Sequence, residues 1–127
     1  TESESSGELA VLCGDLNIVP SAIDSCHGAK ADGLIFHTTE ERSRFESLLE
    51  LGLIDLFRAK NPDSQSFSWW DYRGGAFHRG QGLRIDIVLG TENVLKRVRE
   101  VKIDREFRKK QDGLTASDHA PVIVDLD

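Results

Sequence analysis

The chain has 127 residues, a length that fits one domain of ordinary size and leaves no room for two. Its 39% hydrophobic and 30% charged residues are typical of a globular protein, and no apolar run approaches the roughly 18–20 residues that cross a bilayer. The net charge of −6 is uneven, because residues 1–57 hold three basic and eleven acidic side chains and residues 58–127 hold thirteen and eleven. A local basic surface can still dominate contact with DNA, so net acidity does not exclude a DNA enzyme.

The two cysteines do not indicate a disulfide framework or a zinc site. Cys13 lies in an apolar run and is expected to be a small buried residue in a reducing compartment. Cys26-His27 with His37 lacks the roughly four paired ligands of a structural zinc site. The sequence contains no methionine, so we expect a processed chain or a fragment, with residues 1–8 as a flexible linker.

The first half is expected to form a strand, a loop and a helix. Residues 9–13 are an apolar run typical of a buried strand, and the polar residues that follow lie past its carboxyl end. Residues 20–37 mix glycine, proline and polar residues and indicate a loop. Thr38 and Glu41 have the spacing of a capping box, which predicts a helix that Gly52 can end.

The second half is expected to be rich in short strands. Between residues 83 and 89 apolar side chains alternate, which places Leu83 and Ile85 on an apolar face and Arg84 and Asp86 together on the other. A short helix is predicted at 91–96. Strands are predicted at 67–73, 98–104 and 120–124, and residues 53–57 are predicted to form a short strand or a turn of helix.

Polar side chains follow or interrupt three of the predicted strands. They are Asp15 with Asn17, then Asp86, then Asp118 with His119. Strand ends commonly gather at one edge of a fold, and that edge commonly holds the site. Phosphodiester hydrolysis needs a base for water, a group that stabilises phosphoryl charge, and a divalent metal, and these residue types can supply such parts. Each piece alone also fits an ordinary turn or a solvated surface residue.

Five segments together resemble a known family. The motifs GDLN at 14–17 and SDH at 117–119 are similar to those of the endonuclease/exonuclease/phosphatase superfamily. GLIDLFR at 52–58, FSWWDYR at 67–73 and GLRID at 82–86 resemble exonuclease III and its abasic-site (AP) endonuclease relatives. The resemblance runs from about residue 9 to the end of the chain.

The resemblance implies an α/β (α+β) fold. The chain would be the C-terminal half of a DNase I-like four-layered α/β sandwich, with one mixed, mainly antiparallel sheet and flanking helices. Residues 1–127 would form that half, and the N-terminal half, which brings the principal metal-binding residues in the family, is expected to be absent.

The family also implies roles for the strand-end residues. Asp15 would orient and deprotonate the attacking water, and Asn17 would fix Asp15 and a phosphate oxygen. Asp86 would orient the imidazole of His119, which would bond a non-bridging oxygen. Asp118 would sit beside the metal or the water.

A pocket for a flipped-out abasic sugar and contacts to the DNA backbone are implied as well. Alternation favours core packing for Ile85 over a place in that pocket, and lone loop arginines are often only solvated. The implied pocket residues are Trp69, Leu83 and Ile85, and the implied backbone contacts are Arg73, Arg79 and Arg84.

The implied function is DNA phosphodiester hydrolysis in base-excision repair, with incision 5′ to abasic sites and 3′-exonuclease or 3′-phosphatase activity as additions. Mg²⁺ is the expected cofactor, with Mn²⁺ as an alternative. Double-stranded DNA and a complementary N-terminal half, or a second copy, are the expected partners, in an intracellular location with DNA and away from membranes. Two alternatives stay open: a catalytically incomplete fragment that binds a partner half or DNA without turnover, and a phosphoesterase of the same superfamily with another substrate.

Overall fold

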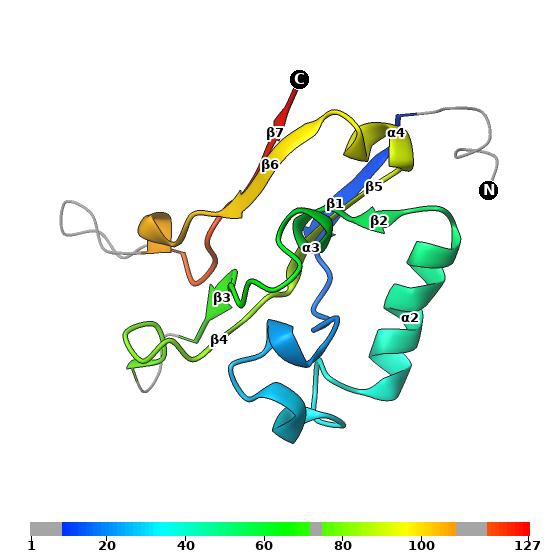
Figure 1. The fold of residues 1–127 in the computed structure, drawn as a ribbon. Helices are drawn as coiled ribbons and strands as arrows, with labels where there is room; N and C mark the ends of the chain where they lie inside the picture. The colour runs from blue at the N-terminus through cyan, green and yellow to red at the C-terminus, as the bar shows by residue number, and fades with distance from the viewer. Residues whose placement is uncertain (1–8, 72–74, 109–116) are drawn as a thin grey trace.

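The computed structural model describes residues 9–71, 75–108 and 117–127, which form short strands and helices (Figure 1). The helices are α2 (Thr39–Glu50), α3 (Leu56–Lys60) and α4 (Glu92–Leu95), with single 3-10 turns at Ala22–Asp24, Gly28–Ala31 and Arg105–Arg108. The strands are β1 (Val11–Asp15), β2 (Ile54–Asp55), β3 (Trp69–Trp70), β4 (Gly82–Leu83), β5 (Asp86–Gly90), β6 (Val98–Ile103) and β7 (Val122–Leu126). No helix among these residues is long and apolar enough to cross a membrane.

The strands pair in antiparallel ladders, which confirms the predicted α/β class with mainly antiparallel strands. One ladder has the order β1-β5-β2, and the described residues add two further pairs, β3-β4 and β6-β7. In the first ladder Asp15, the last residue of β1, lies opposite Asp86, the first residue of β5. The register therefore brings two carboxylates to one end of the sheet.

Helix α2 begins with the predicted capping box. The Thr38 hydroxyl accepts a hydrogen bond from the Glu41 backbone N–H, and the Glu41 carboxylate accepts one from the Thr38 N–H. The helix ends beside Gly52, whose φ of 91° lies in the left-handed region that favours glycine. Phe45 is the buried anchor of this helix and packs with Ile87 and Leu89 of β5.

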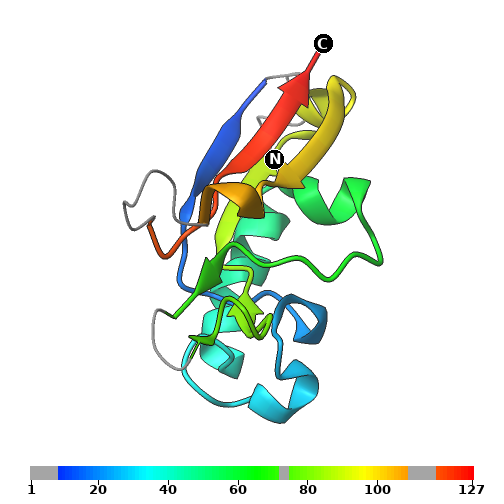
Figure 2. The same cartoon turned by 90° about the vertical axis from the view of Figure 1, so that its left-hand side faces the viewer.

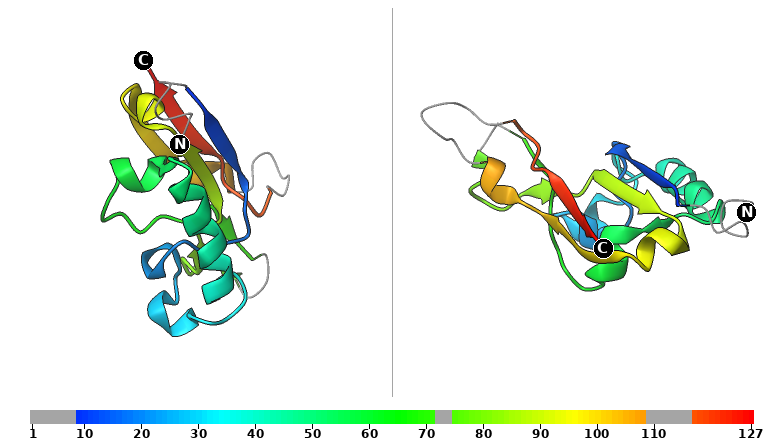
Figure 3. Two further views of the ribbon diagram at one scale, coloured as in Figure 1. Left: turned by 90° about the vertical axis from the view of Figure 1, so that its right-hand side faces the viewer. Right: turned by 90° about the horizontal axis from the view of Figure 1, so that it is seen from above.

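Strand β5 is covered on both faces. Ile87 and Leu89 face the cluster under α2, whereas Val88 belongs to a second cluster formed with α3 and β6 that includes Leu56 and Val101. Figures 2 and 3 show α3 and β1 on opposite sides of the molecule. The predicted strand over 83–89 is divided into β4 and β5, because residues 84 and 85 leave the ladder.

Strand β1 is exposed, which corrects the expectation of a buried strand at residues 9–13. All five of its residues are exposed, with Val11 at 54% and Leu12 at 41%. Cys13, predicted to be buried, is also exposed. The reason is that β1 is an edge strand, paired only with β5 among the described residues. Apolar composition therefore indicated a strand here but not what covers it.

Candidate active site

Two carboxylates and one imidazole meet where β1 ends and β5 begins. The His119 segment reaches them because His119 forms an isolated antiparallel bridge with Trp69 of β3, which itself pairs with β4. Nδ1 of His119 lies 2.7 Å from Oδ2 of Asp86, a charge-assisted hydrogen bond. Nε2 of the same ring lies 3.6 Å from Oδ2 of Asp15.

The surrounding charges favour the protonated imidazole. Partial burial lowers the pKa of His119. The hydrogen bond that the ring makes to the Asp86 carboxylate, and the negative charges of Asp86, Asp118 and Asp15, raise this pKa by more, so the net shift is upward. Asp118 contributes because its Oδ1 lies 3.8 Å from Nε2. The protonated form of His119 is thus more strongly favoured than that of a free imidazole, and in that form its Nε2–H faces Asp15 and Asp118.

Backbone and aromatic groups hold the other two acids. Asn17 adopts a φ of 53°, and its backbone N–H donates to Oδ1 of Asp15 at 3.0 Å, so Asn17 fixes Asp15 through its main chain. The indole N–H of Trp69 donates to Oδ2 of Asp118 at 3.1 Å. The predicted residues Asp15, Asn17, Asp86, Asp118 and His119 are therefore gathered in one place.

The oxygen and nitrogen donors of these residues could form part of the coordination sphere of a hard divalent cation. One ligand atom each of Asp15, Asp86 and His119 lie within 4.8 Å of one another. Asp86 is already bonded to the imidazole. Two other acids lie near the ring, with Oδ2 of Asp15 at 3.6 Å and Oδ1 of Asp118 at 3.8 Å from Nε2 of His119. Mg²⁺ is commonly held by one or two carboxylates together with waters and substrate phosphate oxygens, so two acids are compatible with it. These residues make a partial rather than a full coordination sphere.

An open groove of about 610 Å³ runs past this group of residues. Its polar end holds Asp15, Asp86 and His119, and the rest of its wall is mainly apolar. The apolar wall comes from Cys13 and Gly14 of β1, Ile87 and Val88 of β5, and Ala120, Pro121 and Val122 at the start of β7. The groove is therefore bounded by β1, β5 and the start of the final strand.

A second pocket of about 370 Å³ includes Trp69 and Leu83, two of the residues expected to wall a sugar pocket. Ile85 does not line it. Its side chain is 2% exposed and packs with Val19 and Leu83 in the core, as the alternation of the sequence favoured.

The three arginines expected to contact the DNA backbone differ in their exposure to solvent. Arg84 is 1% exposed, with its guanidinium bonded to Asp24 at 2.7 Å and to Asp55 at 2.6 Å. The prediction that Arg84 contacts DNA is therefore wrong for this structure, because the guanidinium is buried against Asp24, Asp55 and the ring of Phe57 rather than exposed to solvent. Arg79 is exposed, as that role requires. Arg73 lies outside the described residues.

Sequence comparison places the chain in a family. The profile of the Endonuclease/Exonuclease/phosphatase family matches residues 2–119. The chain belongs to this family. Among curated proteins, the exodeoxyribonuclease of Bacillus subtilis (strain 168) is 34% identical over 113 residues, which cover 88% of this chain and 42% of that protein.

Solved structures confirm the resemblance to exonuclease III and AP endonucleases. The 3′ phosphatase NExo from Neisseria, solved bound to product DNA hairpin, has a TM-score of 0.86 and 38% identity over 92% of this chain and 44% of its own. An AP endonuclease from Archaeoglobus fulgidus has a TM-score of 0.86 and 31% identity over 94% of this chain and 46% of its own. This chain thus spans less than half the length of these members of the Endonuclease/Exonuclease/phosphatase family.

Two buried polar residues of this family member were not found from the sequence. Asp24, inside a predicted loop, is fully buried as the partner of Arg84 and Arg58. Ser68, inside an aromatic strand segment, is also fully buried, and its hydroxyl accepts the backbone N–H of Asp86. The sequence does not indicate that either residue is buried, since a lone Asp in a loop and a lone Ser between aromatic residues are also common at protein surfaces.

Proposed function

We propose that this chain supplies the C-terminal part of the active site of a Mg²⁺-dependent DNA phosphodiesterase that incises 5′ to abasic sites. The observation that supports this most is the Asp86–His119 hydrogen bond of 2.7 Å beside Asp15, at the polar end of an open groove. The same chemistry could act on a 3′-terminal nucleotide or a 3′-phosphate, since those reactions also place water against a phosphoryl group.

Each residue has a chemical task in the proposed reaction. Asp15, oriented by the Asn17 N–H, accepts a proton from the attacking water as general base. The Nε2–H of His119 donates a hydrogen bond to a non-bridging phosphoryl oxygen, where negative charge builds. Asp86 holds the ring through Nδ1 and sustains its positive charge, which is the upward shift in the pKa of His119.

Asp15 and Asp118 are the residues of this chain that would hold a divalent cation. When bound it would neutralise charge on the phosphoryl and leaving oxygens. The Trp69 N–H fixes one oxygen of Asp118 and leaves the other facing His119. Mg²⁺ suits these oxygen donors, and Mn²⁺ accepts the same set.

The proposed substrate selectivity comes from the second pocket. The Trp69 ring and Leu83 make an apolar wall of a size suited to a sugar without a base. The indole N–H of Trp69 donates a hydrogen bond to Asp118, which lies next to His119. A sugar that packs on the Trp69 ring would therefore place its adjacent phosphate near His119.

The proposed partner within the protein is a complementary N-terminal half. Large apolar side chains stand exposed on β1 and β7, with Val11 at 54%, Leu12 at 41%, Ile123 at 37% and Leu126 at 48%. The apolar walls of the groove continue this surface, and relatives are more than twice as long as the matched segment. A second copy of this chain is the alternative occupant.

The shortness of the chain favours one other reading, a fragment that binds DNA or a partner half without turnover. A partial set of metal donors would leave the cation weakly held. A phosphoesterase of the same family with another substrate is distinguished by whether the pocket at Trp69 accepts an abasic sugar.

Cleavage of a duplex oligonucleotide with one abasic-site analogue tests the proposal. The chain is assayed alone and mixed with a matching N-terminal half, with Mg²⁺ and with EDTA. We expect metal-dependent incision in the mixture, and a loss of about 10²–10⁴-fold for Asp86→Asn. Asp63→Asn, at an exposed turn after α3, is the matched control and should keep full activity. If neither sample cuts the duplex with Mg²⁺, the nuclease proposal fails.

A further inference from the structure

Ser68 lies at the junction of the two segments that carry Asp86 and His119. Its side chain is fully buried, between the aromatic residues Phe67 and Trp69. The Ser68 hydroxyl oxygen accepts two backbone hydrogen bonds, one from the N–H of Ile85 and one from the N–H of Asp86, both at 3.1 Å. One side-chain atom thus holds Asp86, the first residue of β5, and Ile85 directly before it.

The main chain of Ser68 binds the neighbouring segments. Its N–H donates to the carbonyl of Leu83 at 2.9 Å, and its carbonyl accepts from the N–H of Ala120 at 2.7 Å. Ala120 directly follows His119, and Leu83 ends β4. Ser68 therefore connects the backbone before Asp86 with the backbone after His119, and both partners of the 2.7 Å hydrogen bond depend on it.

The hydroxyl is needed because the strand is interrupted here. β4 ends at Leu83 and β5 starts at Asp86, so residues 84 and 85 lie outside both ladders. At this interruption the N–H groups of Ile85 and Asp86 donate to a side-chain oxygen. Leaving a buried backbone donor without an acceptor is unfavourable, so without the hydroxyl this backbone would move to find another partner.

We infer that Ser68 is a positioning residue that sets the Asp86 carboxylate against Nδ1 of His119. Its consequence for catalysis rests on the proposed phosphodiesterase function, but the geometric claim does not. A residue that served only the stability of the fold would leave the imidazole bonded as before in any variant that folds. A positioning residue would change which ring nitrogen carries the proton.

The tautomer of neutral His119 is the measurement that separates these two roles. Long-range proton–nitrogen NMR spectra of the isotope-labelled chain at alkaline pH report which ring nitrogen is protonated. We expect the Nδ1–H form to dominate in the parent chain, since Nδ1 faces Asp86. In Ser68→Ala we expect a mixture of the two tautomers, and in Ser68→Thr, which keeps the hydroxyl, a return to the parent spectrum.

Ser66→Ala is the matched control, because its hydroxyl bonds only the Ser64 hydroxyl, at 2.8 Å, among the bonds the structure records. It should leave the tautomer unchanged. A folded Ser68→Ala chain with the parent tautomer would overturn the inference. Equal loss in the Ala and Thr variants would overturn it too, because packing rather than the hydroxyl would then be responsible.

Hydrogen exchange in the parent chain covers the case in which Ser68→Ala does not fold. The amide protons of Ile85 and Asp86 should exchange at least about tenfold more slowly than that of Asp63 in the exposed turn after α3, since a bonded amide must open first. Equal rates would refute the bonds to Ser68. None of these measurements needs DNA cleavage, so a failed nuclease assay and a failed positioning role remain distinct results.

Discussion

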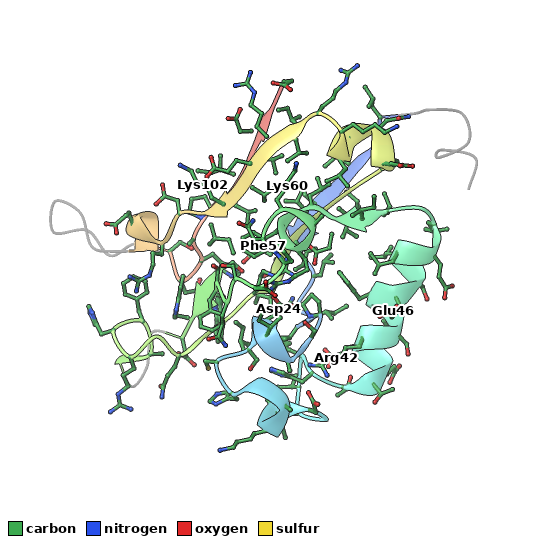
Figure 4. The ribbon with its side chains drawn as sticks, in the orientation of Figure 1. Asp24, Arg42, Glu46, Phe57, Lys60 and Lys102 are labelled. Atoms are coloured by element: carbon green, nitrogen blue, oxygen red, sulfur yellow. The ribbon has the colours of Figure 1, made fainter. Side chains whose placement is uncertain are left out.

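The substitution Asp24→Asn tests whether the buried ionic network holds the molecule together. The Asp24 carboxylate is fully buried and accepts hydrogen bonds from Arg84, at 2.7 Å, and from Arg58. Arg84 is also bound to Asp55 at 2.6 Å, so two guanidinium groups share two carboxylates. Figure 4 shows Asp24 and Phe57 in the middle of the molecule, and the guanidinium carbon of Arg84 lies 5.0 Å from the centre of the Phe57 ring.

Removing the charge of Asp24 should be costly because Arg84 cannot become neutral. Burial lowers the pKa of Arg84, but its hydrogen bonds to Asp55 and Asp24 and their charges raise it by more. A guanidinium stays protonated in proteins, so Arg84 remains a buried cation when one partner is lost. Breaking a buried ion pair from one side costs about 3–5 kcal/mol, a large part of the roughly 5–15 kcal/mol that stabilises a typical domain. The exposed pair of Asp32 and Arg42, at 2.8 Å with half of the Asp32 side chain in solvent, should be worth at most about 1 kcal/mol.

Urea unfolding followed by tryptophan fluorescence measures the difference at equal protein concentrations. We expect Asp24→Asn to lower the free energy of unfolding by about 3–5 kcal/mol and Asp32→Asn by about 0–1 kcal/mol, with unchanged denaturant slopes. If the two variants unfold at the same urea concentration, burial adds nothing to this network and the reasoning fails.

Three further outcomes follow from the site and the exposed strands. The pKa of His119 is raised on folding, so its charge stabilises the fold fully below its ordinary value of 6.5 and ceases to do so as pH rises through the folded pKa. The urea midpoint should accordingly fall as the pH rises above about 6.5. In His119→Gln the midpoint should depend less on pH, and a midpoint that falls with pH as steeply as in the parent chain would contradict the assigned contacts. Trp69→Phe keeps an aromatic wall but removes the N–H bonded to Asp118, and the Mg²⁺ concentration for half-maximal cleavage by the assembled halves should rise about tenfold. The chain alone should associate through the exposed residues of β1 and β7, so its sedimentation coefficient should fall on dilution and Leu12→Glu should weaken the association; a monomer at high concentration would refute this.

Local features of the fold could be predicted from the sequence because nearby residues determine them. Thr38 and Glu41 cap α2 through bonds within a single turn, and Gly52 follows its end. The alternation of Ile87, Val88 and Leu89 placed them on opposite faces, as β5 has them. In each case the cause lies within a few residues of its effect.

The remaining features depend on contacts between distant parts of the chain. Arg84 was expected at a DNA surface, and only its pairing with Asp24, 60 positions away in sequence, makes it a buried residue. Strand β1 was expected to be buried because its composition is apolar, but composition does not say which element covers a strand. Ser68 bonds Asp86 across 18 positions. Tertiary pairings of this kind leave no periodic pattern in a sequence.

The arrangement divides the proposed site into a part that this chain orders by itself and a part that it cannot complete. Asp86 and His119 are fixed by two strands, a bridge to Trp69 and the hydroxyl of Ser68, all from within the chain. The metal donors are instead exposed and few, and they lie at the end of a groove whose apolar wall continues onto open strands. An added N-terminal half should therefore change metal affinity and the exposure of β1 strongly, while the tautomer of His119 stays as it is in the isolated chain.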